Sequence, residues 1–281
     1  MYRHVLVASD PEGLAMATEP VVEALAGSGE PVVRVVGVER ADDSSTVPGL
    51  TEERARELAD RLRAHGVNAT HEVRRVTREK TAEELAAVAR EMEADLIVVG
   101  SHRHGDLAGI LVGSVGHELA TKIDVPMMVV GGPSRQQPLS LRRVLVALDA
   151  SEHTTPVLTA AAQLAGADGD VLLAHVMPAP ITSPLGAVSG EVESEDEAWQ
   201  VLRHAQAELA GMGRASETRL LLSPEPVGDQ IVALAKEWRA DVIAVGSRRL
   251  GDLAALFLGS AAHRIIRLSR VPVLMADHPA E

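Results

Sequence analysis

The sequence contains no cysteine, and only four of its 281 residues are aromatic: two Trp, one Tyr and one Phe. The lack of cysteine excludes disulfide bonds, thiolate nucleophiles and Cys-ligated zinc. No stretch approaches the roughly 20 apolar residues of a membrane helix, and the first apolar run is too short for a signal peptide. We therefore expect a cytoplasmic protein that does not bind a membrane.

Basic residues are also scarce relative to acidic ones, which gives a net charge of −13. An acidic surface repels the phosphate backbone, so we expect no nucleic-acid partner, although a local site for a small anion is compatible with this charge. Apolar residues make up 46% of the chain, so it can bury a core, and aliphatic side chains must pack that core. The P-loop motif and the G-x-S-x-G nucleophile motif are both absent.

A long internal repeat is the main feature of the sequence. Residues 94–130 and 240–276 align without gaps, 146 positions apart, and sixteen of the 37 aligned pairs are identical. The segment "HVLVASD" (His4–Asp10) also matches "RVLVALD" (Arg143–Asp149). This period is far above the roughly 20–50 residues of solenoid repeats, so the chain is one domain duplicated. We expect the first domain at residues 1–132, a linker at 133–141 and the second domain at 142–281.

Short apolar segments alternate with helical segments within each copy. In the first copy we expect strands at Val5–Ala8, Val32–Val38, Val67–Val76, Asp95–Val99 and Pro126–Val130, and helices at Glu19–Ala26, Thr51–His65, Thr81–Glu93 and Ser114–Lys122. Continuously apolar strands between helices indicate a parallel sheet covered on both faces. Each copy is therefore predicted to be an open α/β domain.

Ligands of such sheets bind beyond the carboxyl ends of the strands, where the strand order reverses. An aspartate ends the first predicted strand of each copy (Asp10 and Asp149), and a glycine ends the fourth (Gly100 and Gly246). An aspartate at this edge can accept hydrogen bonds from a ribose or a base. The alternative is structural, since a glycine after a strand also simply makes a turn.

A Gly-Ser pair opens the next helix of each copy, as Gly113-Ser114 and Gly259-Ser260. The free N–H groups and the dipole of a helix N-terminus favour an anion such as phosphate. A Gly-Ser pair is also an ordinary helix cap, and the sequence leaves both interpretations open.

The glycine spacing resembles the ATP-binding signature of the universal stress protein (UspA) family: Gly, two residues, Gly, nine residues, Gly-Ser/Thr. "VLVALDASEH" (Val144–His153), "ADLIVVGSH" and "VPMMVV" are similar to the family's first, fourth and fifth strands. The resemblance implies two tandem five-stranded parallel sheets of order 3-2-1-4-5, with helices on both faces, as in adenine nucleotide alpha hydrolase-like folds. It also implies pairing of the two halves through their fifth strands, Pro126–Val130 and Pro272–Ala276, and further pairing of two chains in a homodimer.

The family's ATP contacts carry over by matching position. The resemblance places the adenine and ribose near the ends of the first and second strands, and the phosphates at the Gly-Ser helix. The implied residues of the first copy are Ala8, Asp10, Val38, Val99, Gly100, Arg103, Gly113, Ser114 and Val115, and those of the second are Ala147, Asp149, Val176, Val245, Gly246, Arg249, Gly259, Ser260 and Ala261.

Both copies depart from the signature, because its second glycine is Arg103 or Arg249. If that position required a positive φ, an arginine there would be costly, unless Gly105 or Gly251 makes the turn instead. The arginine would either fill the phosphate space or neutralise a phosphate. After Asp149 the second copy reads "ASE", which is closer to the family pattern than "PEG" after Asp10, so a single working site would be the second one.

The sequence thus predicts a stress-response regulator that binds ATP, with or without Mg²⁺, or a related adenine nucleotide. We predict no catalytic residue, and no metal site either, because His102 and His104 lack a third ligand. Two alternatives remain: a scaffold whose site is closed by Arg103 and Arg249, and a weak nucleotide hydrolase that uses Asp10 or Asp149.

Overall fold

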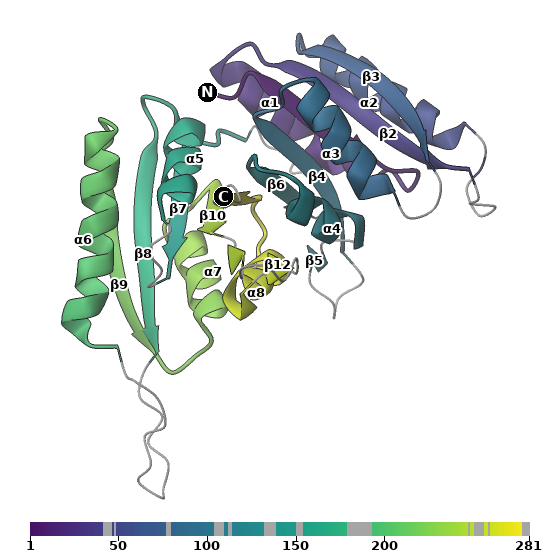
Figure 1. The fold of residues 1–281 in the computed structure, drawn as a ribbon. Helices are drawn as coiled ribbons and strands as arrows, with labels where there is room; N and C mark the ends of the chain where they lie inside the picture. Colours follow the sequence, from purple (N-terminus) through teal and green to yellow (C-terminus); the bar gives the residue numbers. More distant parts are fainter. Residues whose placement is uncertain are drawn as a thin grey trace, which may run out of the picture.

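The fold was analysed in a computed structural model of the chain. The structure describes residues 1–41, 47, 49–76, 80–103, 110–111, 114–131, 139–149, 154–178, 193–246, 248–249, 256–257 and 259–276. Figure 1 shows two similar halves side by side, coloured purple to teal and green to yellow.

The first copy follows the predicted alternation of strands and helices. Its elements are β1 (His4–Ser9), η1 (Leu14–Thr18), α1 (Glu19–Ser28), β2 (Val32–Arg40), α2 (Leu50–Ala64), β3 (Asn68–Val76), α3 (Thr81–Glu91), β4 (Leu96–Arg103), β5 (Ile110–Leu111), α4 (Ser114–Lys122) and β6 (Met127–Gly131). The short 3-10 helix η1 was not expected.

The second copy repeats the pattern. Its elements are β7 (Arg143–Leu148), α5 (Thr155–Ala165), β8 (Asp170–Pro178), α6 (Glu195–Gly211), β9 (Glu217–Ser223), α7 (Val227–Glu237), β10 (Val242–Gly246), β11 (Arg248–Arg249), β12 (Leu256–Phe257), α8 (Ser260–Leu268) and β13 (Val273–Ala276). The strand orders β3-β2-β1-β4-β6 and β9-β8-β7-β10-β13 confirm the predicted order 3-2-1-4-5 in each copy.

The two sheets join into one through their fifth strands. β6 and β13 pair antiparallel, with Met128 opposite Leu274 and Val129 opposite Val273. The prediction that the halves pair through these strands is therefore confirmed within the chain. The joined sheet ends at β3 on one side and at β9 on the other.

The helices cover both faces of this sheet. α1, α2, α5 and α6 pack on one face around residues such as Leu58 and Leu158. α3, α4, α7 and α8 pack on the other around residues such as Leu119 and Ile265. Each of these two apolar clusters includes residues of both copies, so the core is continuous across the junction.

The repeated Ala-Asp pair has a structural role in both copies. The Asp95 carboxylate accepts hydrogen bonds from the backbone N–H groups of Arg3 (2.7 Å) and His4 (2.9 Å) at the start of β1. Asp241 does the same for Arg142 (2.9 Å) and Arg143 (3.0 Å) at the start of β7. These aspartates lie at the amino ends of the strands, at the edge opposite the predicted site.

Across the described ranges, the structure contains no helix that is both long and apolar enough to span a bilayer.

The junction makes a specific prediction about stability. Leu274 is fully buried opposite Met128, so Leu274→Ala should lower the free energy of unfolding by about 2–5 kcal/mol. Leu222→Ala is the control, because Leu222 is 63% exposed and its loss should change that free energy by less than about 0.5 kcal/mol. Urea unfolding measures the free energy of unfolding of both variants. An equal loss in the two variants would show that burial of Leu274 at the junction does not stabilise the fold.

Candidate functional site

The first and fourth strands of each copy are neighbours, which brings the predicted site residues to one edge. Ala8 on β1 lies opposite Val99 on β4, and Ala147 on β7 lies opposite Val245 on β10. Asp10 and Asp149 follow these first strands at their carboxyl ends. The structure therefore gathers these residues where the strand order reverses, as ligand binding in such sheets requires.

In the first copy, Asp10 holds the chain's own backbone. Its carboxylate accepts hydrogen bonds from the N–H groups of Leu14 (3.2 Å) and Ala15 (3.0 Å) at the start of η1. η1 in turn lies against β4, and a Cβ on Gly100 would stand only 2.4 Å from the carbonyl oxygen of Leu14. The glycine at this position is thus explained by close packing within the chain.

In the second copy, the matching glycine is open to solvent. Gly246 is exposed whereas Gly100 is half-buried. Among the described residues, no atom lies within 4 Å of the place where a Cβ on Gly246 would stand. Residues 150–153, which follow Asp149, lie outside the described residues.

The Gly-Ser pair of the second copy opens a helix, as predicted. Gly259 is the N-cap of α8, with φ −51° and ψ 149°, and as a glycine it has no side chain with which to cap the N–H groups of the first turn. Ser260 is exposed and Ala261 is half-buried. Uncapped N–H groups at a helix N-terminus are what an anion requires.

The matching helix of the first copy, α4, begins at Ser114 and continues through the half-buried Val115. Gly113 lies outside the described residues, as do Gly105 and Gly251.

The fourth strand of the first copy does not end at Gly100, contrary to our expectation. It continues to Arg103, because Gly100 and Ser101 stay paired with β6 and the next two residues pair antiparallel with β5. In the second copy, β10 does end at Gly246, and a separate hairpin of β11 and β12 follows.

Arg103 and Arg249 both lie in these short antiparallel ladders, opposite Ile110 and Leu256 respectively. Their backbones are therefore extended, and neither is among the described non-glycine residues with positive φ. The arginines thus replace the glycine of the signature without the backbone strain that a left-handed conformation would impose.

Val38 and Val176 occupy matching positions near the ends of the second strands. Val176 is buried and Val38 half-buried, and both pack with the apolar cluster under α3 and α7. They form an apolar wall beside the strand ends. His117 and His263 are both exposed.

A buried ion pair at the edge of the second copy was not foreseen. His175 is 4% exposed; its Nδ1 lies 3.0 Å from the carbonyl oxygen of Leu148, and its Nε2 lies 3.0 and 2.9 Å from the two carboxylate oxygens of Glu193. Because a carbonyl oxygen only accepts, Nδ1 donates to Leu148, and Nε2 faces the Glu193 carboxylate. The first copy has Gly37 at this position of its second strand.

The pair fixes the segment that leads into α6. The next residue, Ser194, is the N-cap of α6, and it forms a reciprocal capping box with Glu197. Hydrogen bonds from the Ser194 backbone N–H and hydroxyl lower the pKa of Glu197 below its ordinary value. Together these contacts hold the start of α6 beside the end of β7, one residue before Asp149.

The hairpins of the two copies reach across the junction. β5 of the first copy lies against α8, and β12 of the second lies against α4. The Gly-Ser helix of each copy is therefore bordered by the hairpin of the other. At this edge, the described residues bring no three His or acidic side chains together around a common point.

The difference between the two glycines can be tested directly. Gly100→Ala should lower the free energy of unfolding by about 1–3 kcal/mol, because the added methyl group meets the Leu14 backbone. Gly246→Ala should change it by less than about 0.5 kcal/mol, because the position is exposed. Urea unfolding measures the free energy of unfolding of both variants. A loss of stability in Gly246→Ala as large as that in Gly100→Ala would contradict the exposure of Gly246.

Comparison with known proteins gives a consistent result. The sequence model of the universal stress protein family matches residues 1–131 and 140–277. A universal stress protein of Mycobacterium tuberculosis (strain ATCC 25618 / H37Rv) is 30% identical over 196 residues, which are 68% of this chain and 67% of that protein. The crystal structure of a universal stress protein from Archaeoglobus fulgidus shares the fold, with a TM-score of 0.73 over 98% of each chain at 20% identity.

A further solved structure is that of the universal stress protein from Archaeoglobus fulgidus in complex with dAMP. It is 26% identical and covers 47% of this chain and 95% of that chain, with a TM-score of 0.36. The family model alone spans nearly the whole of both copies. The chain therefore belongs to the universal stress protein family and carries its domain twice.

Proposed function

We propose that the chain binds an adenine nucleotide in its second copy and acts as a stress-response regulator. The observation that carries the proposal is the combination of an exposed Gly246 with a glycine-capped α8 N-terminus, with Asp149 at the end of β7, the strand next to β10. The glycine signature of the family spans the first two of these elements.

The base and ribose would lie at the ends of β7, β8 and β10. There Asp149 would accept a hydrogen bond from a ribose hydroxyl or from the adenine amino group. Ala147, Val176 and Val245 are small or branched apolar residues at the same edge, suited to contact with the base. A carboxylate acceptor among apolar neighbours is typical of an orienting contact in a small-molecule site.

The phosphates would lie at the start of α8. The first-turn N–H groups, including that of Ala261, and the exposed hydroxyl of Ser260 supply donors, and Gly259 allows close approach to the backbone. Arg249 adds a positive charge to the hairpin between β10 and α8. A guanidinium suits phosphate oxygens, which supports ATP, with or without Mg²⁺, as the ligand on a chain of net charge −13.

The first copy is proposed to be a structural partner rather than a second site. Its Gly100 lies against the backbone of Leu14, whereas the matching Gly246 is exposed. We therefore assign no nucleotide to the set Ala8, Asp10, Val38, Val99, Gly100, Arg103, Gly113, Ser114 and Val115. One nucleotide is expected for each chain.

The tandem chain is proposed to act as the equivalent of a dimer of single-domain relatives. β6 and β13 pair with each other, so the fifth strand of neither copy has an edge left to pair with another chain. A homodimer of two such chains would have to use another surface.

The expected behaviour of two matched variants separates the copies. Asp149→Ala should weaken ATP binding about 10- to 100-fold, because a charge-assisted hydrogen bond is worth about 1.5–3 kcal/mol. Asp10→Ala should leave the affinity unchanged and lower stability by about 0.5–2 kcal/mol, because it removes the acceptor at the start of η1. Isothermal titration calorimetry gives the affinity and the number of sites, expected to be one.

Thermal unfolding provides an independent check. ATP at 100 times its dissociation constant should stabilise the wild type and Asp10→Ala by about 2.7 kcal/mol. Complete absence of binding would favour the scaffold alternative, in which Arg249 closes the site. Multiple-turnover phosphate release that disappears in Asp149→Ala would favour the hydrolase alternative.

A further inference from the structure

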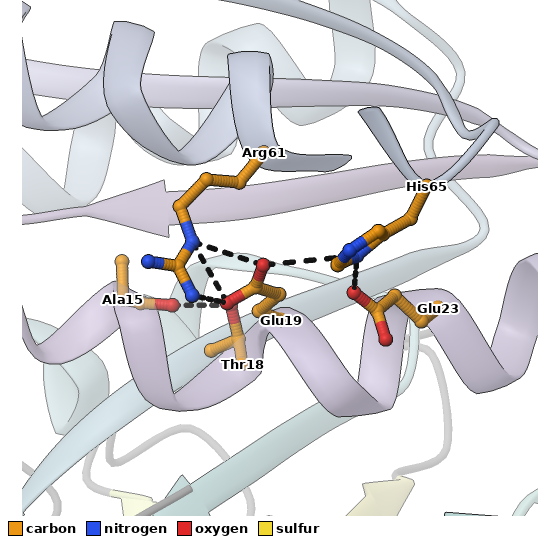
Figure 2. Close-up of polar contacts among 6 residues, drawn as sticks. All are labelled: Ala15, Thr18, Glu19, Glu23, Arg61 and His65. Atoms are coloured by element: carbon orange, nitrogen blue, oxygen red, sulfur yellow. Dashed lines mark hydrogen bonds and ion pairs between the residues drawn. The ribbon is translucent and has the colours of Figure 1, made fainter. Parts of the chain in front are cut away.

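A cluster of charged side chains joins α1 to α2 in the first copy. Glu19 and Glu23 stand one turn apart on α1, and Arg61 in the last turn of α2 is followed by His65, the C-cap residue of that helix. Figure 2 shows the two pairs facing each other across the gap between the helices. Thr18, at the start of α1, donates its hydroxyl to the carbonyl of Ala15 (2.6 Å) and does not enter the cluster.

Glu19 supplies a buried and firmly held carboxylate. Its side chain is 8% exposed, and it accepts hydrogen bonds from Arg61 Nε (3.0 Å to each oxygen) and Arg61 Nη2 (2.6 Å to Oε2). The hydrogen bond to Glu19 raises the pKa of Arg61 above its ordinary value. The arginine therefore fixes the orientation of the carboxylate.

The fold itself does not require this charge. The alignment that matches Asp10 with Asp149 places the fully buried Leu158 at the position of Glu19, and Ala162 at the position of Glu23. The second copy therefore packs the same helix face with apolar side chains. The Arg61 side chain is 53% exposed, and partly exposed ion pairs generally contribute little net stability, so the acidic residues of the first copy call for a separate explanation.

His65 directs one ring nitrogen at both acids. Its Nδ1 contacts Glu23 Oε1 and lies 3.9 Å from Glu19 Oε1. One potential ligand atom from each of these three residues lies within 4.8 Å of the other two. The His65 side chain is 56% exposed and that of Glu23 35%, so both can adjust and solvent can reach the cluster.

We propose that Glu19, Glu23 and His65 bind one divalent transition-metal ion, with Zn²⁺ as the representative ion. Imidazole nitrogen with carboxylate oxygen suits Zn²⁺ and its neighbours, whereas Mg²⁺ and Ca²⁺ favour oxygen alone. Bonds of about 2.0–2.2 Å place tetrahedral ligand atoms roughly 3.3–3.6 Å apart, which small movements of the two exposed side chains achieve. Arg61 orients the buried ligand from outside, and water fills the fourth position.

The charges and the placement of the site are consistent with this ion. The two carboxylates of Glu19 and Glu23 and the one guanidinium of Arg61 together carry a net negative charge. A divalent cation offsets this charge. The ligands come from two helices whose paired residues are 42 positions apart, so the ion would tie α1 to α2. Such an ion stabilises the folded chain, because the unfolded chain does not hold the site together.

Titration of the full-length, chelator-treated chain with Zn²⁺ tests the proposal, without nucleotide present. We expect one Zn²⁺ per chain and a rise in melting temperature. His65→Ala and Glu23→Gln should each weaken binding by more than about 100-fold, because loss of even an outer partner of a metal ligand costs about 10- to 100-fold. Both residues are partly exposed, so both variants should melt like the wild type without metal.

His204→Ala is the matched control, since His204 is an exposed helical histidine of the second copy. It should bind Zn²⁺ as the wild type does, and so should Asp149→Ala, which separates this site from the nucleotide site. The proposal is overturned if His65→Ala and Glu23→Gln retain wild-type affinity, which would place the ion at another of the 11 histidines, or if no Zn²⁺ binds.

Discussion

The antiparallel pairing of β6 with β13 is the constraint on which the rest of the molecule depends. It turns two five-stranded sheets into one sheet and lets each apolar cluster run through both copies. It also brings the hairpin of each copy against the Gly-Ser helix of the other. A ligand at α8 would therefore border β5 of the first copy, so the two halves share the surroundings of one site.

Within this shared frame, the two copies use the same residue types differently. Gly100 is required by the approach of Leu14. Gly246 is exposed, and the edge beside it is fixed by the His175–Glu193 pair, where the first copy has Gly37. Duplication preserves the topology, while the contacts at the matching strand ends differ between the copies.

Apolar periodicity predicted strands that alternate with helices in a parallel sheet. The strand order and the pairing of the fifth strands were predicted from the family resemblance that the glycine spacing and the strand sequences carry. The conformation of Arg103 and Arg249 was not predictable, because it depends on pairing with Ile110 and Leu256 across a hairpin. The His175–Glu193 pair was missed because a long segment separates its members. The i, i+4 spacing of Glu19 with Glu23 was visible, but His65 joins them only through helix packing.

The central claim is that the second copy alone accepts the nucleotide. Amide hydrogen exchange of the whole chain, with and without ATP, locates the ligand without any substitution. If only the second copy binds ATP, exchange should slow at residues 242–246 and at the first turns of α8, and should stay unchanged at residues 14–28 and 96–103. Protection of the first copy's residues instead, or of both copies to the same degree, would contradict it.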